Sequence, residues 1–169
     1  MPANLEEAFK LLSEGNVKEF NGWRMKNLTL KLDFTDKDLS GKNLAGAFLN
    51  GVVADRANFS QANLARTNLV QASLNNANFK GADLTETLLM YAELKEARLT
   101  GANLSKTNLM WANMQNADLT DCKISKTVFV EANMQNVKVS GANKEGAYLK
   151  YAKLEGTAWS EATAEHISH

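Results

Sequence analysis

Net charge, disulfide-forming cysteines and long apolar runs are all missing from this sequence. Nineteen basic and nineteen acidic side chains cancel, so neither the basic footprint of a nucleic-acid-binding protein nor an acidic surface that imitates DNA is indicated. The single cysteine, Cys122, cannot form an internal disulfide. No signal-peptide stretch begins the chain, and no segment approaches the roughly 20 apolar residues of a membrane span. We therefore expect a cytoplasmic protein without nucleic-acid or integral membrane contact, with export by another route left open.

Side chains suited to catalysis are scarce as well. An enzyme needs a nucleophile, an acid–base pair or a metal cluster held in a pocket. The only two histidines, His166 and His169, lie in the C-terminal tail, and the glycines form no phosphate-binding loop. The sequence therefore predicts a protein that is not an enzyme and has no catalytic residue, cofactor site or metal site.

What the sequence has in abundance is a five-residue repeat, which runs without insertion or deletion from residue 44 to residue 164. Of the 25 positions in this register, 22 hold a large apolar residue, and 16 of the positions two residues earlier hold Ala. The residue between these two is usually Asn or Asp, as at Asn58 and Asp83. Two inward side chains separated by an outward one indicate a short strand. The remaining two residues of each repeat must then turn the chain.

Glycine supports these turns. Eight of the ten glycines share one register position, two residues after the large apolar residue, and Asn takes the same position at three further corners. Gly and Asn tolerate positive φ, which a type II turn requires at its second central residue. We therefore predict type II corners with positive φ at Gly41, Gly81, Gly101 and Gly141.

The repeated Ala-Asn/Asp-Leu pattern, seen plainly in residues 57–64, resembles the pentapeptide-repeat family over about three quarters of the chain. The resemblance implies an all-β fold, namely a right-handed quadrilateral β-helix with four repeats per coil and the Leu-like and Ala-like positions inside. A twenty-residue coil has independent support, because Thr67, Thr87, Thr107 and Thr127 recur at that interval. Since these threonines occupy inward positions, we expect their hydroxyls to bond within the wall rather than to form an ice-binding ladder. Cys122 is likewise inward, where a buried inert thiol is expected.

The ends of a solenoid need covers to prevent end-to-end stacking. Four apolar residues near the start have helical spacing: Leu5, Ala8, Phe9 and Leu12. Asn4 is a candidate N-cap and Gly15 a candidate stop. A helix of about ten residues is too short to be stable alone, so we expect it to cap the first coil rather than lie along a side or bind a partner. The segments 11–15 and 20–24 are similar to the lead-in of many cyanobacterial members of the family.

We expect three parts: a helical cap and lead-in at residues 1–30, the solenoid at 31–164 and a tail at 165–169. Near the finish, Lys144 occupies a core position. Because a buried unpaired ammonium is costly, we expect its side chain to reach solvent or the coil to be distorted there. Trp159 is expected to plug the last coil.

Sorting the outward residues by the twenty-residue register separates one side from the other three, which are polar mixtures. This side surrounds the large positions from Leu49 to Leu149 and is called the aromatic side. Of its eighteen outward positions, eleven are apolar or aromatic and only Glu131 and Lys150 are charged. The eleven are Phe48, Val70, Leu88, Met90, Tyr91, Met110, Trp111, Val128, Val130, Tyr148 and Tyr151.

Soluble monomers seldom expose so large an apolar patch, and interfaces favour aromatic residues and Met. The sequence therefore predicts a non-catalytic protein–protein interaction or scaffold module that forms a homodimer or binds a protein partner through the aromatic side. An N-terminal segment folded over part of this side is the plainer alternative. A topoisomerase modulator that mimics DNA, as some family members do, is the functional alternative. It would need a strongly negative surface and a dimerising tail, and the zero net charge and the short tail argue against it.

Overall fold

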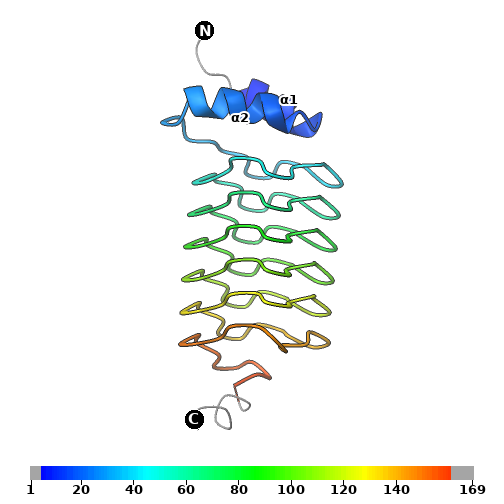
Figure 1. Cartoon of the computed structure of the whole chain (residues 1–169), viewed down its shortest axis with the longest axis vertical. Coiled ribbons are helices and arrows are strands. Elements are labelled where there is room, and N and C mark those ends of the chain that lie inside the picture. The colour runs from blue at the N-terminus through cyan, green and yellow to red at the C-terminus, as the bar shows by residue number, and fades with distance from the viewer. Residues whose placement is uncertain (1–4, 161–169) are drawn as a thin grey trace.

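The computed structural model of the chain describes residues 5–160 and shows a rod of stacked coils with two helices at one end (Figure 1). Parallel β-bridges join residues twenty apart, from Asp33↔Val53 near the start to Asn133↔Lys153 near the finish. Each wall of a coil contributes a single-residue bridge rather than a longer strand. The predicted solenoid, with four five-residue repeats in each coil, is confirmed. Neither helix in this part of the chain has the length and apolarity to cross a membrane.

The large inward position of the repeat is buried along most of the rod. From Leu39 to Val139, every residue at the large position is at most 5% exposed. Phe59 and Phe79 stack in neighbouring coils, with ring centroids 5.1 Å apart. Because burial of apolar surface contributes about 25 cal/mol per Å², this continuous column is the main stabilising feature of the solenoid.

Every corner turns the chain in the same way. The amide of Lys37 donates to the carbonyl of Phe34 at 3.0 Å, and the equivalent bond closes each later corner up to residue 157. At the glycines named above φ lies between +64° and +70°, which confirms the predicted positive φ. Residues other than glycine at this position also have positive φ, between 56° and 61°. The stacking of coils therefore imposes the left-handed conformation on whichever residue occupies the corner.

The Asn and Asp residues between the two inward positions bond to their own corners. Asp38 Oδ1 accepts from the amide of Ser40 at 3.0 Å, and Asn58 Oδ1 accepts from that of Ser60 at 3.1 Å. The Asn58 amide also donates to Asp38 in the coil before it. Side-chain bonds of this kind stabilise turns, which explains the preference for Asn and Asp at this position.

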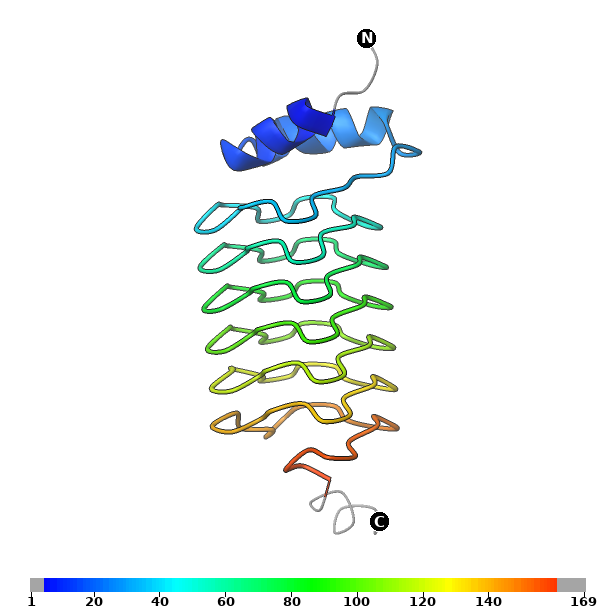
Figure 2. The same ribbon diagram turned by 180° about the vertical axis from the view of Figure 1, so that it is seen from behind.

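The first helix, α1 (Leu5–Ser13), lies across the first coil, as the opposite views of Figures 1 and 2 both show. Ala8 and Leu12 are buried, and the Phe9 ring contacts Phe34 with a centroid separation of 5.8 Å. The chain leaves the helix at Gly15, where φ is +76°. The predicted cap over the first coil is confirmed, whereas the candidate N-cap, Asn4, lies outside the described residues.

The structure adds a helix that the sequence did not predict. A second helix, α2 (Val17–Lys26), follows the first and contains the segment 20–24 that was assigned to the lead-in. Asn21 and Gly22 are poor helix formers, so the local sequence gives little sign of a helix here. Docking stabilises it instead, since Phe20 is fully buried and Arg24 is 4% exposed.

Two side chains of α2 replace the backbone partners that a preceding coil would supply. Asn21 accepts a hydrogen bond from the amide of Phe48 and donates one to the carbonyl of Gly46, both at 2.9 Å. Arg24 donates to the carbonyl of Asn50 at 3.4 Å and to two carbonyls of the lead-in. Its burial lowers the pKa of the guanidinium. Helix α2 therefore covers the open edge of the first coil but leaves the aromatic side itself uncovered, so the alternative in which the N-terminal segment folds over that side is wrong.

At the other end the coil is distorted where Lys144 takes a core position, as expected. The bridge that would join Lys123 to Asn143 is missing from the otherwise regular series within residues 33–153. The amide of Lys126 bonds to the carbonyl of Gly146 instead of to the residue before it. Trp159 is 6% exposed, which confirms the predicted plug. The register continues without a projecting loop up to residue 156. Residues 161–169, with both histidines, lie outside the described part of the chain.

Candidate interaction surface

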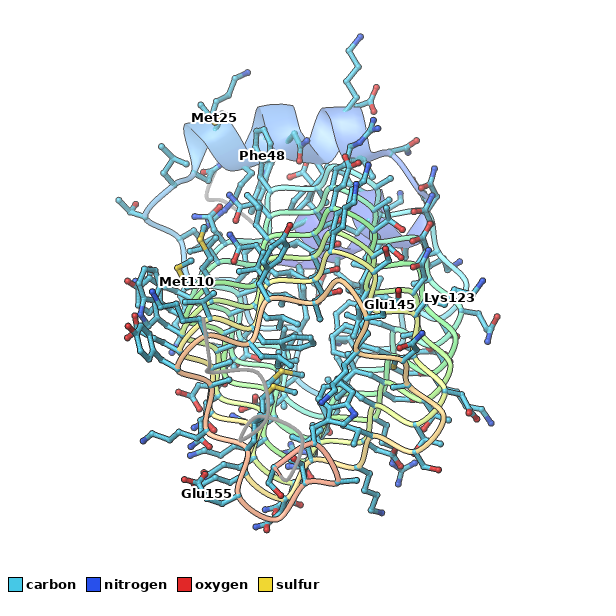
Figure 3. The ribbon with its side chains drawn as sticks, turned by 60° about the horizontal axis from the view of Figure 1, so that its bottom comes forward. Met25, Phe48, Met110, Lys123, Glu145 and Glu155 are labelled. Carbon is cyan, nitrogen blue, oxygen red and sulfur yellow. The ribbon has the colours of Figure 1, made fainter. Side chains whose placement is uncertain are left out.

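The eleven apolar residues of the aromatic side all point outward in the structure. Six of them are exposed large hydrophobic residues, from Leu88 at 38% to Tyr151 at 71%. The other five are half-buried: Val70, Met90, Met110, Val128 and Val130. Figure 3 shows Met110 on a different side of the rod from Lys123 and Glu145, which belong to a polar side. The sorting by register therefore gathers these residues as predicted, and their role in binding is a proposal.

The middle of the aromatic side is a single column of residues. Consecutive β-bridges link the members of this column: Phe48, Asn68, Leu88, Asn108, Val128 and Tyr148. Four of the six are large and apolar, at the position where the repeat elsewhere prefers Asn or Asp. Asn108 still accepts a hydrogen bond from the amide of Met110 at 3.1 Å. The four apolar side chains cannot accept the equivalent bond at their own corners. The aromatic side thus gives up a local hydrogen bond in four coils and exposes apolar surface instead.

The corner beside this column carries the largest side chains. Tyr91 and Trp111 occupy equivalent positions in adjacent coils and stack, with ring centroids 4.7 Å apart and planes 11° apart. Both have φ of 59°, a conformation that is unusual for bulky residues and costs roughly 1–2 kcal/mol relative to the right-handed region. Met90 and Met110 precede them at the same two corners. The four residues form the compact cluster that their spacing predicted, with Tyr91 51% and Trp111 40% exposed.

The inner wall behind the aromatic side holds the threonine column. All four threonines are fully buried, and each hydroxyl donates to the carbonyl of the residue 23 positions earlier, at 2.6–2.8 Å. Thr107, for example, bonds to Leu84 in the preceding coil. The predicted hydroxyl column within the wall is confirmed, and an ice-binding role for it is excluded. These bonds tie successive coils together within the inner wall of the aromatic side.

Charged side chains pair with one another away from the aromatic side. Arg56 bonds to Asp36 at 2.7 Å and lowers the pKa of that carboxyl. Lys106 and then Arg66 lower the pKa of Glu86, which lies between them in the stack. Residues 31–160 contain thirteen acidic and fifteen basic side chains, so the solenoid carries no net negative charge.

Within the described residues, nothing resembles a reactive centre. Cys122 is 4% exposed, its thiol donates to the carbonyl of Leu99 at 2.9 Å, and burial raises its pKa to about 12. A thiol so rarely ionised is a poor nucleophile, which confirms the expectation of an inert cysteine. No group of three or more His, Cys, Asp or Glu between residues 5 and 160 is placed to hold a metal ion. A shallow hollow beside the Arg66–Glu86 ion pair is lined mainly by small side chains.

Sequence reasoning missed two exposed apolar residues at the helical end. Met25 and Leu28 are each 58% exposed. Met25, in the last turn of α2, lies at the same end of the rod as Phe48 (Figure 3). Leu28 lies twenty residues before Phe48, so extending the register one coil toward the N-terminus would have placed it in line with the aromatic side.

Comparison with known proteins agrees with this architecture. A family model described as pentapeptide repeats matches eight copies, over residues 33–69, 55–89, 92–129 and 127–162. No protein of curated function matches the sequence.

Several solved structures are similar to this chain. QnrB1, a plasmid-mediated fluoroquinolone resistance protein, is 20% identical over 79% of this chain and 80% of its own, with a TM-score of 0.55. A pentapeptide repeat protein from the thylakoid lumen of Arabidopsis thaliana is 29% identical over 65% of this chain and 70% of its own, with a TM-score of 0.45. HetL, involved in heterocyst differentiation regulation in the cyanobacterium Nostoc, is 20% identical over 75% and 86% of the two chains, with a TM-score of 0.38. The family match and the likeness to QnrB1 agree with the fold, a right-handed quadrilateral β-helix, and say nothing of partners.

Proposed function

The chain belongs to the pentapeptide-repeat family, and we propose that it is a non-catalytic interaction or scaffold module whose binding surface is the aromatic side. One observation carries this proposal. The aromatic side departs from the local preferences of the repeat at four of its six strand positions and lacks Gly at five of its six corners, while its inner wall keeps the usual pattern. Departures from local sequence preference that bring no gain in folding are expected at functional sites.

The physical character of this side suits an interface. Its side chains project from a wall whose backbone is hydrogen-bonded to the coils on both sides, so binding would cost little ordering of the chain. Tyr91 and Trp111 restrain each other by stacking. Large aromatic residues at the centre of an interface tend to contribute most of the binding energy. Trp111, near the middle of the rod, is therefore the expected anchor.

The DNA-mimic alternative has weaker support. The likeness to QnrB1 is a likeness of fold, at 20% identity. Basic side chains outnumber acidic ones between residues 31 and 160, whereas a mimic of DNA needs a strongly negative face.

We also propose a cytoplasmic location and the division into a cap at 1–30, a solenoid at 31–164 and a tail at 165–169.

The test compares two substitutions at equivalent corners. Trp111→Glu places a charge at the centre of the aromatic side. Asn116→Glu places the same charge at the next corner of the same coil, where φ is also 59° and the residue is exposed. Both variants and the wild type are immobilised and used to capture proteins from the native cell, and each is also examined by sedimentation and by thermal melting.

We expect Trp111→Glu to abolish association, with itself or with captured proteins, while Asn116→Glu retains it. Both variants should melt close to the wild type, because both side chains point away from the core. If the two variants retain the same proteins and the same assembly state as the wild type, the aromatic side is not the binding surface. A large fall in melting temperature for Trp111→Glu alone would show that the side chain supports the fold instead.

A further inference from the structure

We propose that the partner of the aromatic side is a second copy of this chain, docked antiparallel, so that the first coil of one rod meets the sixth coil of the other. This inference rests on the proposed function and adds the identity and orientation of the partner. It comes from the order of residues along the two corner columns of the aromatic side: the four central residues of the first column read the same in both directions, and those of the second pair polar with polar and aromatic with aromatic.

The first corner column runs Asn50, Val70, Met90, Met110, Val130 and Lys150. Its four central residues form a palindrome, Val-Met-Met-Val, centred between the third and fourth coils. In a two-fold interface, if residue i contacts residue j, then j contacts i. A two-fold axis at this centre places Val70 on Val130 and Met90 on Met110 of the second copy. Both types of pair then match in size and polarity.

The second corner column runs Gly51, Gln71, Tyr91, Trp111, Glu131 and Tyr151. The same axis places Tyr91 against Trp111 of the second copy, so that the stacked pair meets its own equivalent. Gln71 meets Glu131, and the amide of Gln71 can donate to the carboxylate. Gly51, which has no side chain, meets Tyr151, which is 71% exposed and needs room.

The strand column between the corners agrees at its ends, where Phe48 meets Tyr148 of the second copy. In its middle Leu88 meets Asn108 and Val128 meets Asn68. These two asparagines already accept hydrogen bonds from the amides of their own corners. Their carbonyl oxygens are therefore partly satisfied before any partner arrives.

Other arrangements of two copies bring unfavourable charges together. A parallel dimer sets Lys150 against Lys150 of the second copy and Glu131 against Val128. An antiparallel dimer shifted by one coil toward the C-terminus sets Lys150 against Val70 and Glu131 against Tyr91. A shift by one coil toward the N-terminus leaves Tyr148 and Tyr151 without a partner. Of the arrangements compared, only the unshifted antiparallel one engages all six coils and leaves no charge on the two corner columns facing an apolar residue.

The experiment exchanges the valine pair for a charge pair. Val70→Lys and Val130→Glu lie on one chain three coils apart, roughly 14 Å at the usual spacing of stacked strands, so they interact weakly within a molecule. In the antiparallel dimer each lysine meets a glutamate of the other copy. The variants are Val70→Lys, Val130→Glu, the double variant carrying both, and the like-charge control Val70→Glu with Val130→Glu.

Dimerisation is measured by sedimentation equilibrium, and folding of each variant by circular dichroism. We expect each single variant to raise the dimer dissociation constant by at least about tenfold, because the two-fold axis buries two unpaired charges. The double variant should return to within about threefold of the wild type, and the like-charge control should not recover, on the usual scale of complementary interface charges. If the double variant dimerises no better than the single variants, the antiparallel arrangement is overturned.

A second measurement does not depend on the charged variants. Since Cys122 is buried and its pKa is raised to about 12, a cysteine introduced by Lys42→Cys can be spin-labelled alone. Antiparallel rods separate the two labels along the rod by about five coils, roughly 24 Å, whereas parallel rods place them at the same height. A wild type that stays monomeric at high concentration overturns the second copy as partner. The proposed function then still stands if Trp111→Glu, but not Asn116→Glu, loses captured proteins.

Discussion

The aromatic side and the opposite side of the rod enclose the same core but differ at most of their outward positions. The opposite side, called here the polar side, surrounds the large positions Leu39, Phe59, Phe79, Leu99, Leu119 and Val139. Its strand positions include Asn and Asp that bond to the corner, and four of its six corners carry Gly at the position of positive φ. The aromatic side has Gly at only one of six corners and apolar residues at four of six strand positions. The polar side is what the five-residue repeat favours locally, so the aromatic side reflects a requirement other than folding.

If the two sides share one core, the same core substitution should be equally damaging beneath each. Leu109→Ala beneath the aromatic side and Leu99→Ala beneath the polar side each remove a fully buried leucine. We expect each to lower the free energy of unfolding by about 2–5 kcal/mol, the usual cost of such a cavity. Urea unfolding measures both. A clearly smaller loss for Leu109→Ala would mean that the wall beneath the aromatic side can collapse, and that the two walls are not equivalent.

The edge of the first coil differs between the sides because α2 bonds to it on the aromatic side. Asn21→Leu leaves the amide of Phe48 and the carbonyl of Gly46 without their side-chain partner. We expect a loss of about 0.5–1.5 kcal/mol, as for an ordinary hydrogen bond, because solvent partly reaches both backbone groups. Asn21→Asp can still accept from Phe48 but cannot donate to Gly46, so it should lose less. Equal melting temperatures for Asn21→Leu and the wild type would show that water replaces these bonds.

Exchanging corner residues between the sides should shift stability in opposite directions. At Gly101, on the polar side, an added Cβ would meet no atom within 4 Å, and φ is +69°. Gly101→Ala should therefore cost about 1 kcal/mol through the backbone alone. On the aromatic side Gln71→Gly should gain about 0.5–1 kcal/mol, because glycine adopts positive φ without strain. Chemical denaturation at low protein concentration tests both, and a stabilising Gly101→Ala would contradict the account of the corners.

The threonine column predicts a smaller effect confined to the aromatic side. Thr107→Val removes the hydroxyl that bonds to the carbonyl of Leu84 at 2.6 Å but keeps the side-chain volume. That carbonyl still accepts the amide of Thr87 across the corner, so we expect a loss of about 0.5–1.5 kcal/mol, as for one hydrogen bond. Thr107→Ser, which keeps the hydroxyl, is the control for bonding. No loss for Thr107→Val would mean that the column serves packing alone.

The effect that is smallest at neutral pH concerns Cys122, the one thiol among the inward positions. The pKa of Cys122 rises from 9.0 to about 12 on folding because of burial. Its contribution to stability is therefore fully present below pH 9.0 and is lost as the pH rises toward 12, since the unfolded chain ionises first. Relative to Cys122→Ala, the wild type should lose stability across this window. At neutral pH an alkylating reagent should label the thiol only after unfolding, and rapid labelling of the folded protein would refute its burial.

Much of the fold and of the aromatic side could be predicted from the sequence, because each five-residue repeat specifies its own conformation. Two inward residues, one outward residue and two turn residues recur with one period, so the core, the corners and the sorting of the eleven aromatic-side residues all follow from the register. The distorted coil could be predicted for the same reason, because Lys144 places a charged residue at the large apolar position of the register. The stacking of Tyr91 on Trp111 was implied by their spacing of twenty, although the closeness of the rings was not.

Two features were decided by the tertiary structure alone. Helix α2 could not be predicted because its residues favour helix weakly. It is stabilised by docking, since Phe20, Asn21 and Arg24 pack against or bond to the edge of the first coil. The positive φ of residues such as Trp111 could not be predicted either, since their own preference is for the right-handed region. Each coil lies on a neighbour whose corner already has that shape, and hydrogen bonds between coils hold it there. The sequence by itself determined which residues face inward, because alternation along a short strand is local. The tertiary structure decided how the first coil is closed and which residues bear backbone strain, because the first depends on helix α2 and the second on the neighbouring coils.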